Sequence, residues 1–163
     1  MVDIYRFLAE NNIAYERHDH PAVYTVAEAE LLVPPLPAVK TKNLFLRDKK
    51  GRRHFLVAVP ARKRVNIKAL GALIGSGHLS FGSPQRLKKY LGVDPGSVTV
   101  LATINDPDQA VELVFDEILW LEEVFQFHPL VNTSTLLITR ENLLRYFKLT
   151  GHDVRRVDVP SPD

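Results

Sequence analysis

The stretch Val39-Lys40-Thr41-Lys42-Asn43-Leu44-Phe45-Leu46 places two lysines and an amide directly before a run typical of a β-strand. Lysine is depleted at buried strand positions, because an uncompensated ammonium is costly to remove from water. We therefore predict that Lys42 and Asn43 lie at the mouth of a sheet, where side chains meet solvent and ligand. Two interpretations stay open: the pair faces water at an ordinary strand start, or it belongs to a functional site.

The hydrophobic pattern around this stretch alternates between short strands and short helices. Residues 44–47 and 54–59 predict a hairpin, and Thr25 with Glu28 three residues on predicts a capped helix start. Helices are predicted over residues 3–12, 26–32, 68–74, 84–91 and 140–147. Further strands are predicted over residues 14–18, 98–102, 111–115, 135–139 and 154–159. The pattern over 118–124 fits either a helix or a strand. This mixture predicts one compact α/β domain over residues 1–163, built around a mixed sheet.

The composition is that of a globular protein and excludes several kinds of chemistry. The chain has 163 residues, of which 45% are hydrophobic and 25% are charged, and it contains no cysteine. Disulfides, thiolate zinc sites and a cysteine nucleophile are therefore excluded. The first residues lack the basic segment and apolar run of a signal peptide, and no apolar run is long enough to span a bilayer. We expect a cytoplasmic protein without a membrane partner.

The net charge of +2 hides an uneven distribution of charge along the chain. The segment 40–89 holds 14 of the 21 basic residues and a single acid, Asp48, whereas the segment 90–139 holds eight acids and no Lys or Arg. If the basic segment shares one face, it forms a patch that attracts polyanions such as nucleic acid. Alternatively, the two segments are solvated faces that partly pair with each other.

Common catalytic and cofactor motifs are missing from the sequence. No G-x-x-x-x-G-K-[ST] and no G-x-S-x-G is present, and Gly75-Ser76-Gly77 lacks the third glycine of a dinucleotide site. His18, His20 and His128 can be combined into a metal site on paper, but no acidic residue stands at a recognised ligand spacing. We therefore predict no metal and no cofactor.

Seven short motifs carry a resemblance that covers essentially the whole chain. They are His20-Pro21-Ala22-Val23-Tyr24-Thr25, Lys42-Asn43-Leu44-Phe45-Leu46, Leu79-Ser80-Phe81-Gly82, Leu91-Gly92-Val93-Asp94-Pro95-Gly96-Ser97-Val98-Thr99, Ile104-Asn105-Asp106, Phe127-His128-Pro129-Leu130-Val131-Asn132-Thr133 and Gly151-His152. In this order and spacing they resemble the YbaK/ProX family of free-standing aminoacyl-tRNA editing enzymes, which are relatives of the editing domain inserted in bacterial prolyl-tRNA synthetase. The branch that looks closest is the ProX-type alanyl-tRNA(Pro) deacylase. The resemblance implies an α/β fold with a central mixed, partly barrel-like sheet flanked by short helices.

The resemblance also implies an activity, which is hydrolysis of the ester that joins a wrong amino acid to tRNA(Pro). Carried over onto matching positions, it assigns catalytic roles to Lys42, Asn43 and His128. The candidate substrate contacts are Tyr24, Phe81, Gly96, Ser97 and Leu130. The candidate tRNA contacts in the basic segment are Lys40, Lys49, Lys50, Arg52 and Arg53. The implied partners are tRNA(Pro) carrying a wrong amino acid and, as a further candidate, prolyl-tRNA synthetase.

These residues suit the implied chemistry, because an aminoacyl ester is already activated and needs no protein nucleophile. Hydrolysis needs a held carbonyl, a placed water and stabilisation of the developing oxyanion. Lys42 can form an ion pair with the phosphate of the terminal adenosine or with negative charge near the ester. Backbone N–H groups around Gly96 can hold the carbonyl, because glycine allows close approach. His128 is either a pocket wall or a general base. The alternatives are the same chemistry on another mischarged tRNA, such as cysteinyl-tRNA(Pro), and a non-catalytic tRNA or aminoacyl-binding module.

Overall fold

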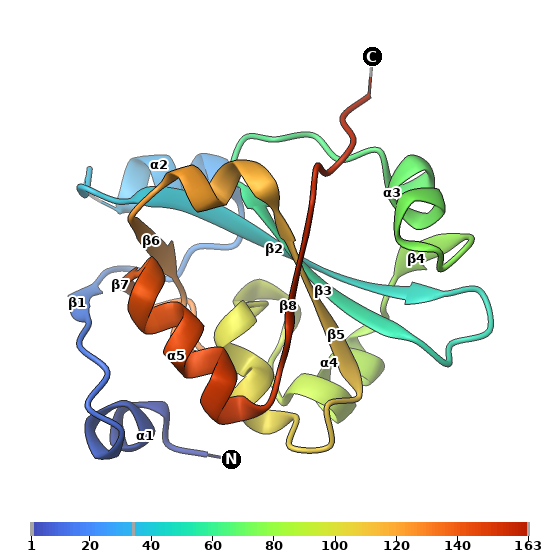
Figure 1. The fold of residues 1–163 in the computed structure, drawn as a ribbon. Coiled ribbons are helices and arrows are strands. Elements are labelled where there is room, and N and C mark those ends of the chain that lie inside the picture. The colour runs from blue at the N-terminus through green and yellow to red at the C-terminus, as the bar shows by residue number, and fades with distance from the viewer. Residues whose placement is uncertain (1, 34, 163) are drawn as a thin grey trace.

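The strand β2 (Val39–Asp48) is the centre of the structure, a computed structural model that describes residues 2–33 and 35–162. It pairs antiparallel with β3 (His54–Pro60) and β4 (Leu79–Phe81), and parallel with β6 (Val124–Phe127). The remaining strands are β1 (Glu16–Asp19), β5 (Val111–Asp116), β7 (Ser134–Thr139) and β8 (Val154–Val157). The strand order is β1-β7-β6-β2-β3-β5-β8, with β4 beside β2 and off this path. The predicted α/β fold with a mixed sheet is confirmed (Figure 1).

The helices begin and end where the sequence supplies capping residues. They are α1 (Ile4–Glu10), α2 (Val26–Leu32), α3 (Ile67–Ile74), α4 (Pro84–Leu91), α5 (Arg140–Thr150) and the short 3-10 helices η1 (Pro95–Ser97), η2 (Val100–Asn105) and η3 (Glu117–Leu121). The Thr25 hydroxyl accepts the Glu28 N–H at 3.1 Å, which fixes the start of α2 close to the first half of β2. The Ser83 hydroxyl does the same for α4 by accepting the Arg86 N–H at 3.2 Å.

The sheet divides the apolar core into two clusters because side chains alternate along each strand. On β3, Leu56 and Ala58 belong to a large cluster that also includes residues of α1, α4, η2 and α5. Phe55 and Val57 point the other way, into a smaller cluster with residues of α3 and β4. β3 is therefore buried on both faces. The two clusters hold β2 in place from both sides.

Two predicted details are wrong, and both concern the surroundings of β2. Lys42 and Asn43 lie inside β2 rather than before it, because the strand begins at Val39 and pairs with β6 there. Residues 98–102 do not form a strand. The Val100 and Leu101 N–H groups donate to side-chain oxygens, and Val100 opens the 3-10 helix η2. The ambiguous segment 118–124 is mostly helical, as η3, and its last residue opens β6.

Within residues 2–33 and 35–162, no helix is both long and apolar enough to cross a membrane.

Candidate active site

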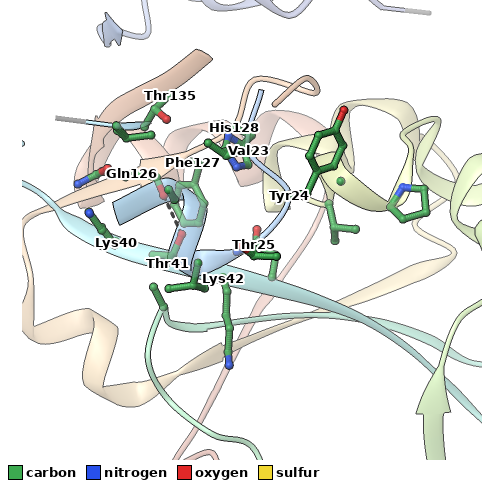
Figure 2. A pocket seen from close by; sticks show the side chains of 18 residues that line it. Val23, Tyr24, Thr25, Lys40, Thr41, Lys42, Gln126, Phe127, His128 and Thr135 are labelled. Atoms are coloured by element: carbon green, nitrogen blue, oxygen red, sulfur yellow. Dashed lines mark hydrogen bonds between the residues drawn. The ribbon is translucent and has the colours of Figure 1, made fainter. Parts of the chain in front are cut away.

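A cavity of about 190 Å³ opens beside the first half of β2, next to α2, β6 and η1 (Figure 2). Its lining combines aliphatic side chains with neutral polar groups and two lysines. The lining residues are Val23, Tyr24, Thr25, Val26, Ala29, Val33, Lys40, Thr41, Lys42, Asn43, Ala61, Pro95, Gly96, Val98, Gln126, Phe127, His128 and Thr135. The fold therefore brings together six residues singled out from the sequence: Tyr24, Lys40, Lys42, Asn43, Gly96 and His128.

Lys42 is a half-buried ammonium without an acidic side chain in ion-pair range in the part of the chain that the structure describes. Burial alone lowers the pKa of Lys42 below its ordinary value. Figure 2 shows the side chain leaving β2 on the side away from His128 and Tyr24. A charge that has lost part of its hydration is stabilised by a bound anion. Lys42 is therefore a cation of the site that a phosphate or an oxyanion can pair with.

Thr41 and Asn43 alternate with the two lysines along β2 and fasten the strand to its surroundings. The Thr41 hydroxyl donates to the Gln126 carbonyl at 2.7 Å, which links β2 to β6. The Asn43 Oδ1 accepts the Val100 N–H at 2.6 Å, which fixes the start of η2. Because η1 ends only two residues before η2 begins, Asn43 also helps to position the cavity wall formed by Pro95, Gly96 and Val98. Asn43 thus has a structural contact that fixes the backbone beside the cavity.

His128 is mostly buried, and its ring hydrogen bond defines its tautomer. The Nδ1 lies 3.1 Å from the Ser134 carbonyl, which can only accept, so Nδ1 carries the hydrogen and donates it. Burial lowers the pKa of His128, and the nearby His20 lowers it further, while the bond to Ser134 opposes the shift. The ring is therefore neutral near pH 7, and Nε2 is available as a hydrogen-bond or proton acceptor.

Tyr24 and Gly96 close one side of the cavity by direct contact. A Cβ atom on Gly96 would lie 2.7 Å from Cδ1 of the Tyr24 ring, so only glycine fits beneath this ring without displacing it. The neighbouring Ser97 is buried, and its N–H donates to the Asp94 carbonyl at 2.9 Å. Of the predicted Gly96–Ser97 pair, Gly96 lines the cavity and Ser97 does not.

The comparisons with known proteins agree with this geometry. The family described as "Aminoacyl-tRNA editing domain" matches residues 20–146, which is more than half of the chain. The chain belongs to the aminoacyl-tRNA editing family. Its reaction class is therefore the deacylation of mischarged tRNA.

Individual relatives span almost the same length. "Prolyl-tRNA editing protein ProX" from Acetoanaerobium sticklandii is 36% identical over 152 residues, which is 93% of this chain and 93% of that protein. "Prolyl-tRNA synthetase associated domain-containing protein 1" from Bos taurus is 37% identical over 153 residues, covering 90% of this chain and 87% of the relative. A solved structure, described as a candidate trans-editing enzyme for prolyl tRNA synthetase, has a TM-score of 0.67 at 20% identity and covers 99% of both chains. At this identity the structural likeness shows the shared fold.

Two residues predicted to contact the substrate lie outside the cavity of this editing domain. Phe81 is 60% exposed on β4 and pairs with Leu46, at the other end of β2 from Lys42. Leu130 is buried in the large core cluster and has a φ of +70°, a left-handed conformation that costs a non-glycine residue about 1–3 kcal/mol. Leu130 therefore shapes the turn after His128, and neither side chain is a wall of this cavity.

The predicted tRNA contacts divide into three groups. Lys40 lines the cavity, whereas Lys49, Lys50 and Arg52 are exposed in the β2–β3 hairpin loop. Arg53, at the end of this loop, binds the Glu112 carboxylate through Nε at 2.9 Å and Nη2 at 2.8 Å. The basic and acidic segments of the sequence therefore pair in part, as one of the two interpretations predicted.

Several residues that line the cavity were not predicted from the sequence, and for one of them, Gln126, the spacing from His128 could have indicated it. Gln126 lies two residues before His128, and alternate residues of a strand share a face. Its Nε2 donates to the Ala38 carbonyl at 2.8 Å, which holds the entry to β2. Val98, Ala61 and Thr135 reach the cavity through tertiary contacts that no local pattern predicts.

Proposed function

We propose that this editing domain removes alanine from mischarged tRNA(Pro) by hydrolysing the ester at the 3′-terminal adenosine. The observation that carries the proposal is Lys42, a half-buried ammonium with a pKa lowered by burial, at a small cavity with aliphatic and neutral polar walls. Such walls suit a small aliphatic side chain, and the ammonium suits the phosphate or oxyanion that accompanies the ester. The name of the bacterial relative, "Prolyl-tRNA editing protein ProX", supports tRNA(Pro) as the RNA.

In the proposed reaction, water adds to the ester carbonyl, the bond to the ribose oxygen breaks, and a proton passes to that leaving oxygen. Lys42 supplies positive charge to the adjacent phosphate or to the oxyanion. The Gly96 backbone, which lines the cavity beside the Tyr24 ring, holds the carbonyl in this proposal. His128 accepts a hydrogen bond at Nε2, from the attacking water or from the substrate amine. The ribose hydroxyl beside the ester orients the water.

Selection of alanine over proline is proposed to rest on size. One methylene is worth only about 1–3 kcal/mol of attraction, so affinity for the methyl group alone discriminates weakly. Overpacking of a rigid site costs a similar amount, which penalises the larger proline ring. Tyr24 and His128 are candidate walls for this exclusion, because both line the cavity.

A panel of aminoacylated tRNAs tests the proposal. The purified protein is incubated with alanyl-, cysteinyl- and prolyl-tRNA(Pro) and with alanyl-tRNA(Ala), and ester loss is followed at constant enzyme concentration. We expect fastest loss of alanyl-tRNA(Pro) and protection of prolyl-tRNA(Pro). Fastest loss of cysteinyl-tRNA(Pro) would favour the alternative substrate, and binding without hydrolysis of any ester would favour a non-catalytic module. Adding prolyl-tRNA synthetase tests whether that candidate partner changes the rate.

A further inference from the structure

We propose that the β2–β3 hairpin loop and α4 form a second contact with the substrate, a phosphate-binding face for the double-helical part of the tRNA. The inference rests on the proposed function, because it concerns the same aminoacyl-tRNA, but it places a contact outside the cavity. The residues of this hairpin–α4 face are Arg47, Lys49, Lys50, Arg52, Arg86 and Lys89. Three of them, on β2 and α4, were not among the tRNA contacts predicted from the sequence.

The hairpin loop and α4 are joined directly, although they are far apart in the sequence. The Arg86 Nη1 donates to the Gly51 carbonyl at 3.2 Å and to the His54 Nε2 at 3.1 Å. Gly51 has a φ of +66°, and a Cβ there would lie 2.6 Å from Arg86 Nη2. Glycine thus permits both the turn and the close approach of the guanidinium. Cations from two segments are therefore held on one surface.

The charges on this face are largely uncompensated. Among the ion pairs of the described residues, none involves any of the six cations of the hairpin–α4 face. The nearby Asp48 carboxylate accepts the Arg52 and Arg53 N–H groups at 2.8 and 3.1 Å, and these bonds help keep its pKa low. The Asp48 carboxylate offsets one positive charge of the face, and its hydrogen bonds also shape the hairpin loop. Burial and the neighbouring Arg86 lower the pKa of His54, as expected where cations crowd together.

The position of the face relative to the cavity identifies the partner. Lys42 and Asp48 are six residues apart on β2, which corresponds to about 20 Å along a strand. With the aminoacylated end in the cavity, the single-stranded 3′ end leads away from Lys42 and the first base pairs follow. A spaced array of Lys and Arg, in which Lys49, Lys50, Arg52 and Lys89 are exposed, fits the repeated phosphates of a duplex, whose counterions it displaces. The inferred ligand is therefore duplex RNA rather than a single anion.

A paired set of lysine variants tests the inference. The double variant Lys50→Gln/Lys89→Gln removes two exposed charges from the face, and Lys68→Gln/Lys148→Gln removes two exposed lysines elsewhere. Arg86 stays unchanged, because it also supports the hairpin. Deacylation is measured between low and high salt on alanyl-tRNA(Pro) and on an alanylated CCA trinucleotide, which has the ester but no duplex.

We expect kcat/KM of the first variant on alanyl-tRNA(Pro) to fall about tenfold at low salt, with a log–log salt slope shallower by about 1 to 2. Its rate on the trinucleotide should equal that of the control. Equal kinetics of the two variants on alanyl-tRNA(Pro), as expected of a face for an acidic protein, would overturn the inference. So would an equal loss on the trinucleotide. If the unmodified protein hydrolyses neither substrate, the proposed function fails instead.

Discussion

The two halves of the β2 region carry lysines in opposite surroundings. Lys42 lies in the first half, half-buried at the cavity, with a pKa lowered by burial. Lys49 and Lys50 follow the other end of the strand and are exposed. An exposed charge attracts a distant polyanion at little cost but is screened by salt, whereas a partly desolvated charge acts strongly over a short range. We therefore expect the same residue type to serve chemistry at one end of β2 and attraction of tRNA at the other.

The largest effect is expected from removing the cavity charge. We expect Lys42→Ala to lower kcat/KM on alanyl-tRNA(Pro) by about 10²–10³, the usual cost of losing one group that stabilises charge in the transition state. Lys49→Ala, the matched exposed lysine, should change it less than threefold. Single-turnover deacylation measures both. A folded Lys42→Ala variant with near-normal hydrolysis would show that Lys42 has no part in the mechanism and that Lys42 and Lys49 do not differ in this respect.

Shrinking the cavity walls should relax the selection against proline. Tyr24→Ala and His128→Ala are expected to raise hydrolysis of prolyl-tRNA(Pro) by about 10- to 100-fold relative to that of alanyl-tRNA(Pro), which corresponds to about 1–3 kcal/mol of lost exclusion. Phe81→Ala is the control, since Phe81 lies outside the cavity. If every stable variant still spares prolyl-tRNA(Pro), selection lies in how the amine or carbonyl is held.

Asn43 should affect both the rate and the stability, because its oxygen fixes η2 beside the cavity. Asn43→Ala leaves the Val100 N–H without its acceptor, which is expected to cost about 1–3 kcal/mol of unfolding free energy. The displaced wall should lower kcat by about tenfold. Asn43→Asp keeps the acceptor oxygen and should retain most of the stability. A normal denaturation midpoint for Asn43→Ala would contradict this positioning role.

The lowered pKa of Lys42 predicts a specific dependence on pH. The charged form is lost as pH rises through a value below the ordinary 10.5, so enzymatic deacylation should decline there after the uncatalysed rate is subtracted. Over the same pH range, Lys42 keeps its proton in the unfolded chain but has released it in the folded protein. The contribution of Lys42 to the free energy of unfolding therefore becomes more favourable as pH rises. Lys42→Met should therefore raise the melting temperature slightly at pH 7. A lower melting temperature would show that the ammonium is stabilised by the fold.

The smallest effect is expected at Arg53, the loop cation that is already paired. Its bidentate bond to Glu112 leaves it less free to bind phosphate than Lys50. Arg53→Gln should leave the salt dependence of tRNA deacylation unchanged and cost at most about 1 kcal/mol of stability, as is usual for exposed pairs. A shallower salt slope, equal to that of a Lys50 variant, would mean that the ion pair with Glu112 does not keep Arg53 from binding phosphate.

Local signals predicted the elements around the site well. The Thr25 cap, the helix over 84–91 and the strand over 54–59 depend on neighbouring residues, and these elements form where expected. The predicted strand over 98–102 was wrong because the Asn43 oxygen, remote in sequence, takes the Val100 N–H. Sequence likewise cannot show that β4 pairs with the far end of β2, which separates Phe81 from Lys42.

The origin of the cavity walls determines when the cavity can form during synthesis. The hairpin, β4 and α4 of the proposed phosphate-binding face lie within residues 39–91, so they are synthesised before the last walls of the cavity. The cavity also needs Val23, which is held by Asn132, and it needs Gln126 and Thr135. We expect a ribosome-bound chain that exposes residues 39–91 but not Gln126 to leave the ester on tRNA intact, which a deacylation assay on stalled complexes can measure. If the proposed face binds tRNA, the growing chain presents that face before it can hydrolyse any ester on the tRNA.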